Sequence, residues 1–353
     1  MYTKEEIDII VLSSFNEIPL NIKYSLFSDG NYEYKKNKLI KTLPCGVYNK
    51  VESNFSDRAY RQSVLDGLEK KGIKCVTSVS ADYPETLKNI DVPPLLLYCK
   101  GDTSLLKSNC FSVVGSRRTP PDALAHCKKL AGELSSVFTV VTGLAEGADT
   151  SVLEGALAAG GKVISVLANG FGCVYPACNS SLLKRVENQG LAITEHLPHV
   201  KPQPRFFPVR NRIIAGLSRG TLVVCAPEKS GALITAEYAE EYNRDVFAFP
   251  YSLGVAVGAG CNFLIKKGAK LTENVLDIFA AYGLDFNTHE KIQLTELEYE
   301  VYEYLKNSDK AFIFEVAESL HKFPNEIIPA MMSLQIKGLA VGLGGNAYKA
   351  LNR

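Results

Sequence analysis

The sequence lacks an excess of charge of either sign, a paired-cysteine motif and a long apolar run. Lys and Arg number 39 against 38 Asp and Glu, so a site for a polyanion must be a local basic patch. The nine cysteines form no CxxC pair and are odd in number, which favours reduced thiols. No run reaches the roughly 18 apolar residues of a membrane span, and the acidic N-terminus has no apolar core. These absences predict a cytoplasmic protein without membrane contact.

Signatures of metal, cofactor and catalytic sites are also missing. Cys173 and Cys178 precede His196 and His199, but their spacing fits no usual zinc pattern, so no metal is expected. There is no GxGxxG motif, and residues 155–162 depart from a phosphate-binding loop, so no nucleotide cofactor is expected. The serines of the loops described below have no evident base among the five histidines, and we expect no catalytic residues.

The pattern along the 353 residues divides the chain into three parts. Residues 1–70 predict a small helical module, 71–285 an α/β core and 295–353 a third domain, after a polar linker at 288–294. Apolar strands alternate with helices in the core, which predicts a Rossmann-like, doubly wound, mostly parallel sheet. We expect strands at residues 73–77, 95–99, 111–114, 139–142, 163–168, 192–195, 221–226 and 246–249, and helices at 122–136, 149–159, 179–188, 210–217 and 235–242.

The C-terminal domain begins with a Thr295-x-x-Glu298 capping box, which opens a helix. Two further helical patterns and a glycine-rich hairpin follow, and together these elements predict a winged helix. Winged helices often read DNA grooves with their third helix. Here that helix, residues 325–337, carries Glu326 and a single basic residue, Lys337. We therefore expect it to contact protein or to regulate, rather than to read DNA.

Three glycine-containing loops each follow a predicted strand and precede a helix, at residues 115–119, 143–149 and 227–231. The carboxyl ends of parallel strands share one edge of the sheet, where ligands bind. Glycines let the backbone approach a ligand, and helix N-termini attract phosphates through free N–H groups and a partial positive charge. One such loop alone is more simply a tight turn, but three on one edge, with Arg117 and Arg118, favour a phosphate site.

A fourth segment, residues 206–212, opens a helix with two phenylalanines and two arginines around an amide. Arginines and an amide can hold phosphates, and an aromatic ring can stack on a base with about 1–3 kcal/mol. The simpler alternative is a solvated helix start with Phe207 in the core. That alternative accounts for one phenylalanine but less well for both arginines.

Six motifs occur along residues 75–280 in a defined order. They are Val114-Gly115-Ser116-Arg117, Gly143-Leu144-Ala145-x-Gly147-x-Asp149, Tyr175-Pro176-x-x-Asn179, Phe207-Pro208-x-Arg210-Asn211-Arg212, Ser230-Gly231-Ala232-Leu233-Ile234-Thr235-Ala236 and Gly260-Cys261-Asn262-x-Leu264-Ile265. With these motifs the chain resembles the DprA/Smf family, the DNA-processing protein A family of bacteria. The resemblance is highly specific because several long motifs co-occur.

The resemblance implies a non-enzymatic protein that binds single-stranded DNA, protects incoming strands in natural transformation and helps load the recombinase RecA. It implies a homodimer, with a contact through Asn262, Phe263, Leu264 and Ile265. Arginines of the motifs should hold phosphates, and glycines with Ser230 should give backbone contacts. The predicted DNA-binding residues are therefore Gly115, Ser116, Arg117, Arg118, Gly143, Gly147, Phe207, Arg210, Asn211, Arg212, Lys229, Ser230, Gly231 and Thr235.

The chain departs from the family at two positions, with Leu153 where histidine is usual and Ala232 where serine is common. Residues 1–70 match the family only weakly. Two other functions stay open. One is a nucleotide or nucleoside-phosphate hydrolase on a related Rossmann-like core, for which Glu195 and Glu228 are the candidate carboxylates. The other is a signalling domain that senses a small nucleotide.

Overall fold

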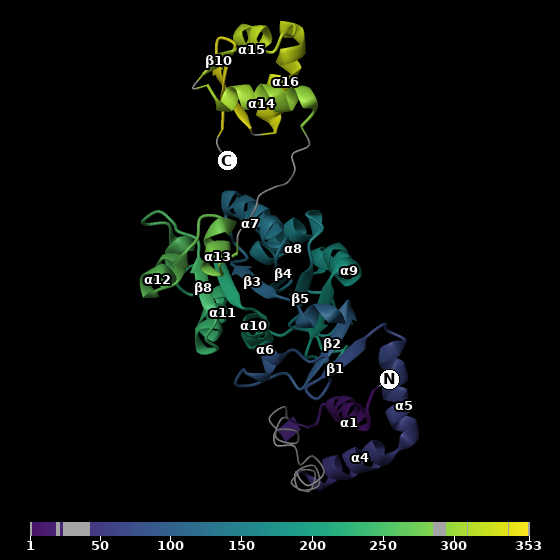
Figure 1. Cartoon of the computed structure of the whole chain (residues 1–353). Helices are drawn as coiled ribbons and strands as arrows, with labels where there is room; N and C mark the ends of the chain where they lie inside the picture. Colours follow the sequence, from purple (N-terminus) through teal and green to yellow (C-terminus); the bar gives the residue numbers. More distant parts are fainter. Residues whose placement is uncertain are drawn as a thin grey trace. The chain divides into compact units, whose positions relative to one another are not determined.

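The computed structural model describes residues 2–18, 22–23, 43–284, 294–308, 310–337 and 339–351. The chain divides into two compact units, Met1–Leu284 and Asp285–Arg353, and each is described by itself (Figure 1). The helical module and the core that we predicted both belong to the first unit. The predicted linker at residues 288–294 lies outside the described residues except for Leu294. Among the helices that the structure describes, none is both long and apolar enough to cross a bilayer.

A sheet of nine strands, counted over the described residues, forms the centre of the first unit. Its order is β1-β2-β6-β5-β4-β3-β7-β8-β9. The strands are parallel from β6 to β9, and the edge pairs β1–β2 and β2–β6 are antiparallel. The Rossmann-like, mostly parallel sheet is thus confirmed. The strands are β1 (Lys74–Thr77), β2 (Leu96–Gly101), β3 (Cys110–Gly115), β4 (Thr139–Thr142), β5 (Val163–Val166), β6 (Leu191–Thr194), β7 (Gly220–Cys225), β8 (Asp245–Ala248) and β9 (Lys270–Leu271).

Helices cover both faces of this sheet because its central strands are buried on both sides. Figure 1 shows α7, α8 and α9 on one side of the strands and α6, α10 and α11 on the other. The helices are α6 (Glu85–Lys88), α7 (Pro121–Leu134), α8 (Ala148–Ala158), α9 (Ser180–Gln189), α10 (Phe206–Leu217), α11 (Gly231–Glu241), α12 (Ala259–Lys267) and α13 (Val275–Ala281).

Two of these helices begin four residues earlier than we predicted. In α10, Pro208 lies in the first turn, where a missing N–H and a fixed φ are tolerated. In α11, Ser230 is the N-cap, and its hydroxyl accepts a hydrogen bond from Ala232 N at 3.3 Å. The early starts place Phe207 and Gly231 within helices rather than in the segments before them.

The central strand β3 pairs with β4 on one side and with β7 on the other. The chain leaves β3 through α7 to reach β4, whereas β7 leads through α11 to β8 on the opposite side. This reversal is the switch point of a doubly wound sheet, where the loops diverge and leave room for a ligand. The loops after β3, β4 and β7 all lie at this edge.

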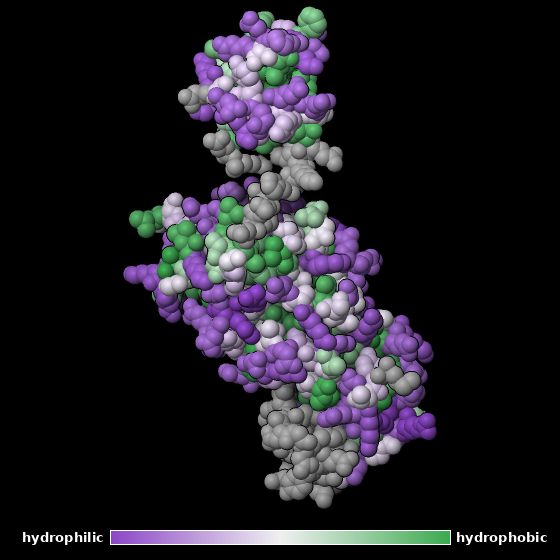
Figure 2. Space-filling view, viewed as in Figure 1, coloured by the Kyte–Doolittle hydropathy of each residue, from purple (hydrophilic) through white to green (hydrophobic). Residues whose placement is uncertain are grey.

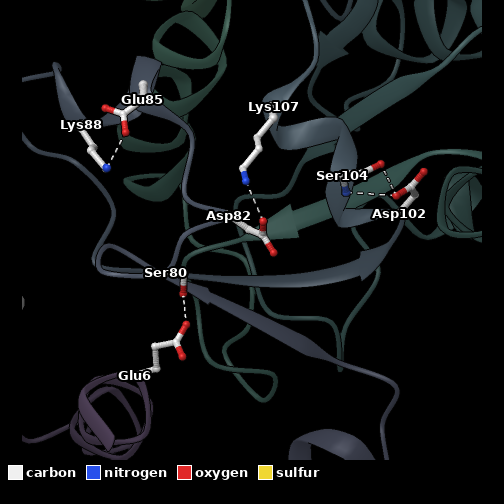
Figure 3. A network of polar contacts seen from close by, with 8 residues as sticks. All are labelled: Glu6, Ser80, Asp82, Glu85, Lys88, Asp102, Ser104 and Lys107. Carbon is white, nitrogen blue, oxygen red and sulfur yellow. Dashed lines mark hydrogen bonds and ion pairs between the residues drawn. The ribbon is translucent and has the colours of Figure 1, made fainter. Parts of the chain in front are cut away.

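The N-terminal helices α1 (Lys4–Ser13) and α5 (Arg58–Glu69) pack beside β1 and β2, whereas α4 (Cys45–Ser56) packs against α1 in a separate apolar cluster (Figure 1). Ile9 and Ile10 of α1 join an apolar cluster with residues of both strands. A polar contact adds to it, because the Ser80 hydroxyl donates to Glu6 Oε1 at 2.5 Å (Figure 3). The loop beyond Ser80 carries a further ion pair, between Lys107 and Asp82 at 2.8 Å.

The second unit contains, in its described residues, three helices and a three-stranded antiparallel sheet of order β10-β12-β11. The predicted capping box of Thr295 and Glu298 is confirmed at the start of α14. Val301, Val316 and Met331 lie in its apolar core. The elements are α14 (Glu296–Lys306), β10 (Ala311–Phe312), α15 (Ile313–Ser319), α16 (Pro324–Ile336), β11 (Ala340–Gly344) and β12 (Ala347–Ala350).

A buried carboxylate joins α14 to the end of α16. Glu298 accepts a hydrogen bond from Lys337 Nζ at 2.6 Å and another from Thr295 N at 2.7 Å. The Lys337 contact is the main reason that the pKa of Glu298 falls to about 2. Because this value lies below the roughly 4.3 of an unfolded chain, the stabilisation is complete above pH ~4.3 and is lost as the pH falls toward 2.

We expect Glu298→Gln to raise hydrogen exchange of α14 and α16 about tenfold at neutral pH, because a hydrogen bond to a charged group is lost. The acid-induced rise in exchange seen in the parent should be smaller in this variant. Exchange is measured by mass spectrometry on the full chain. Glu300→Gln, at an exposed position of the same helix, is the control and should behave like the parent. Equal exchange in both variants at every pH would contradict a stabilising role for Glu298.

Candidate nucleic-acid interface

A cavity of about 370 Å³ opens at the switch point, between the loops that follow β3, β4 and β7 and the start of α10. We call it the first cavity. Ala145 and Pro227 lie on its wall between the predicted loops. The structure thus brings the three loops and the fourth segment together. The predicted site residues that line the first cavity are Gly115, Ser116, Arg117, Arg118, Phe207, Arg210, Asn211, Lys229, Ser230, Gly231 and Thr235.

The loop after β3 holds its two arginines in solvent. Gly115 is packed so closely that a Cβ would lie 2.7 Å from both Ala148 Cβ and Val224 Cγ2. Ser116 N donates to Cys225 O at 2.8 Å, and Ser116 Oγ accepts from Arg118 N at 3.1 Å. With the backbone fixed in this way, the exposed side chains of Arg117 and Arg118 project from a rigid base.

Arg210 lies inside the protein, only 6% exposed. Its Nη1 donates to Val166 O at the end of β5, and its Nε donates to Asn211 Oδ1 at 3.0 Å. The Asn211 amide in turn donates to Gly231 O at 3.1 Å. This chain of hydrogen bonds ties the start of α10 to the strand edge and to the start of α11.

Asp149 is a lining residue to which our prediction gave no role, although it closes one of the quoted motifs. Ala145 N donates to its Oδ2 at 3.1 Å. Burial raises the pKa of Asp149 above its ordinary value, and the charge of Arg210 offsets only part of this rise. Burial likewise lowers the pKa of Arg210, with Asp149 opposing it. The two residues form a buried pair of opposite charges beneath the first cavity.

Gly143 and Gly147 lie behind the wall and do not belong to the described lining. A Cβ on Gly143 would clash with Asp149 Oδ2 and would lie 2.5 Å from Arg210 Nη1. Gly147 has a φ of 80°, and a Cβ there would lie 2.6 Å from Arg117 O. These glycines let the arginine-bearing segments pack closely.

Aromatic rings flank the arginines at the mouth of the first cavity. The Phe207 ring centroid lies 5.0 Å from Arg117 Cζ and 5.9 Å from Arg210 Cζ. Tyr175 meets Phe207 edge-on at 5.6 Å and keeps 40% of its surface exposed. Tyr175 was also missed as a site residue, although its motif was quoted. Phe207 is thus held between cations, and Tyr175 offers an open ring beside it.

The start of α11 forms the opposite wall. Lys229 is exposed, and Gly231 is the first residue of an 11-residue helix whose N-terminus faces the first cavity. Thr235 Oγ1 donates to Gly231 O at 3.4 Å, so this hydroxyl is used within the helix. The described lining therefore combines four cationic side chains and a helix N-terminus with the single carboxylate of Asp149.

Arg212 is not among the described residues that line the first cavity. We expected it to hold a phosphate, but its Nη2 pairs with Glu195 Oε2 at 2.6 Å, and the two side chains are 5% and 7% exposed. The reason is helical geometry, because residues two apart point to different sides of α10. Arg212 therefore anchors α10 to the segment after β6. Glu195, a candidate carboxylate of the hydrolase alternative, therefore already forms an ion pair with Arg212.

The predicted dimer residues differ in exposure. Leu264 is buried, and the Asn262 side chain bonds both backbone polar groups of Tyr251, at 3.0 and 2.9 Å. Ile265 is half-buried, whereas Phe263 is 53% exposed. Figure 2 shows apolar surface around α12 and α13.

The cysteines and histidines considered for a metal have other contacts. Cys178 Sγ donates to Glu146 Oε1 at 3.4 Å, and His199 Nε2 lies 3.0 Å from the Asn16 amide. Over the described residues, no three His, Cys, Asp or Glu side chains are grouped so that they could hold a metal ion.

The first cavity lies within the part of the chain that matches a known family. The family described as DNA recombination-mediator protein A matches residues 74–283. The chain belongs to this family. It is 41% identical to the DNA processing protein DprA of Streptococcus pneumoniae over 200 residues, which are 57% of this chain and 71% of that protein. It is 39% identical to DprA of Bacillus subtilis over 222 residues, 61% of this chain and 73% of that protein.

Solved structures of this recombination-mediator family share the fold. The X-ray structure of DprA from Streptococcus pneumoniae aligns with a TM-score of 0.63 at 33% identity, over 79% of this chain and 98% of that chain. A structure of DprA from Helicobacter pylori, described by its single-stranded DNA binding mode, aligns with a TM-score of 0.54 at 28% identity. That alignment covers 60% of this chain and 95% of the other.

We expect Gly143→Ala to lower the free energy of unfolding by about 1–3 kcal/mol, because its methyl group overpacks the Asp149–Arg210 pair. Gly231→Ala is the matched control. A Cβ there meets nothing within 4 Å, so its stability should stay within about 0.5 kcal/mol of the parent. Urea titration followed by circular dichroism measures both. Equal stability of the two variants would show that the Gly143 contact is not tight.

We expect Arg212→Leu to lower the free energy of unfolding by about 3–5 kcal/mol, because the buried Glu195 carboxylate loses this ion pair. Arg117→Ala, at an exposed arginine, should change it by less than about 0.5 kcal/mol. The same urea titration compares them. A small effect of Arg212→Leu would mean that Arg212 is not structural and would restore it as a candidate phosphate contact.

Proposed function

We propose that the first cavity binds the phosphates of single-stranded DNA and that the chain does no chemistry on the strand. The observation that carries this proposal is the gathering of Arg117, Arg118, Arg210 and Lys229 with the N-terminus of α11 around one cavity. The net charge of the whole chain is only +1, so this is a local basic patch on a balanced surface. The DNA-binding mode described for the Helicobacter pylori relative supports the same ligand class.

The cations divide into two groups with different tasks. Arg117, Arg118 and Lys229 are exposed, so their hydrated side chains can follow a flexible strand. Arg210 is buried and prearranged, so it attracts a phosphate from the cavity floor. Electrostatic attraction of phosphates, with few fixed contacts to the bases, allows single strands of different sequence to bind. Tyr175 and Phe207 can stack bases beside these phosphates.

The arrangement favours binding over hydrolysis. Asp149 is the carboxylate of the described lining, and its Oδ2 already accepts a hydrogen bond from Ala145 N. Glu228 lines a neighbouring hollow with Lys229 instead of the first cavity. A glycosidic or phosphate hydrolase needs a carboxylate that reaches substrate or water. We therefore place the chain with non-enzymatic binders.

The remaining expectations extend this proposal. We propose that the chain protects incoming DNA, helps load RecA in natural transformation and acts in the cytoplasm. A homodimer through the surface around Phe263 would place two first cavities in one particle. We also propose that the second unit is a winged helix that contacts protein, because Ile328, Met332 and Ile336 expose an apolar stripe along α16.

We expect Arg117→Ala to weaken binding of a single-stranded oligonucleotide and to flatten its salt dependence. Loss of one phosphate contact should reduce the slope of log affinity against log salt by about 0.7. Fluorescence anisotropy at several salt concentrations measures both. Arg185→Ala, at an exposed arginine of α9 away from the first cavity, is the control and should keep the parent slope.

Two results would overturn the proposal. Binding of oligonucleotides by Arg117→Ala and Arg210→Ala with the parent's affinity and slope would remove the first cavity as the site. Release of free base or phosphate from nucleotides by the purified parent, lost in Asp149→Asn, would favour the hydrolase instead.

A further inference from the structure

A second cavity, of about 460 Å³, opens beyond the loop that forms the wall of the first. Arg118 lines the first cavity and Pro120 lines the second, so only Thr119 separates the two cavities along the chain. Two residues of extended chain span roughly 7 Å. A strand that crosses this loop therefore passes from one cavity directly to the other.

The second cavity has an apolar, preorganised wall. Phe249, Pro250 and Tyr251, which follow β8, face Pro120 across it. The Tyr251 ring cannot turn freely, because its hydroxyl donates to Val224 O at 2.7 Å and Gly258 packs against its face. Fixed aromatic and proline surfaces bind flat apolar groups with little loss of side-chain entropy.

The charge of the second cavity is opposite to that of the first. None of the described residues that line it is Lys or Arg, whereas Asp122, Glu273 and His126 lie on its rim. These three side chains are exposed and make no hydrogen bond or ion pair with another described residue. A phosphate would be repelled here. A neutral flat group that carries hydrogen-bond donors could pack on the aromatic and proline wall and donate to the carboxylates of Asp122 and Glu273.

We propose that the second cavity receives a nucleobase with an exocyclic amino group, from the strand whose phosphates occupy the first cavity. This inference rests on the proposed function. Cytosine, adenine and guanine each carry such an amino group, and Asp or Glu accepts from the N4 amino group of cytosine. Thymine has no amino group and offers the carboxylates of Asp122 and Glu273 only its N3–H, which lies between two carbonyl oxygens that repel a carboxylate. The second cavity would thereby add a preference for certain bases to the binding of the sugar–phosphate chain in the first cavity.

The test compares oligo-dC with oligo-dT of equal length on the full chain at neutral pH. Fluorescence anisotropy should show about tenfold tighter binding of oligo-dC, as expected for one good contact to a base edge. In the double variant Asp122→Ala, Glu273→Ala the two oligomers should bind within about twofold of each other. Removal of two carboxylates also strengthens both affinities by reducing repulsion, so the ratio of affinities is the quantity that decides.

Glu241→Ala is the matched control, because Glu241 is an exposed carboxylate at the far end of α11. It should retain the parent's preference for oligo-dC. Equal affinity of the parent for both oligomers would overturn the inference, and so would a preference that survives in the double variant. In either case Arg117→Ala still tests the first cavity separately. Failure of the parent to bind either oligomer would overturn the proposed function together with this inference.

Discussion

A buried guanidinium holds the candidate site together. Arg210 reaches the end of β5 through Val166 O, and through Asn211 it reaches the start of α11 at Gly231. A charge inside a protein is costly unless it is paired and hydrogen-bonded, and here the Asp149 carboxylate and these acceptors supply the compensation. Because the partners come from separate segments, the position of Arg210 determines how the strand edge, α10 and α11 meet.

This constraint explains the distribution of glycines. Gly143 leaves the space in which Asp149 and Arg210 approach, and Gly147 lets the loop after β3 pack against the start of α8. Gly231 has no such neighbours and stands open at the helix N-terminus. Two of these glycines therefore serve packing, while Gly231 is the one placed for a ligand. The exposed arginines depend on this tight base, because a loose loop would not direct them toward one cavity.

Both cavities follow from a single topological feature. The chain diverges from β3 toward β4 and β7, and the loop between β3 and α7 stands between the two hollows. Four cations and one carboxylate line the first cavity on one side of this loop, whereas the described lining of the second cavity has two carboxylates and no Lys or Arg. A single strand of DNA suits this arrangement better than a small nucleotide does, because its phosphates and its bases can occupy the two cavities at the same time.

The sequence by itself determined eight of the nine described strands of the large sheet, five of its helices and the common edge of three loops. Apolar periodicity is a local property, and the alternation of strands with helices implies parallel strands whose carboxyl ends share one edge. It also indicated eleven residues that line the first cavity. It could not separate Arg117, exposed to solvent, from Arg212, buried against Glu195, nor reveal the roles of Asp149 and Tyr175. Only tertiary packing decided these, because the direction of a side chain from a helix and its partner across the fold depend on segments far apart in the chain.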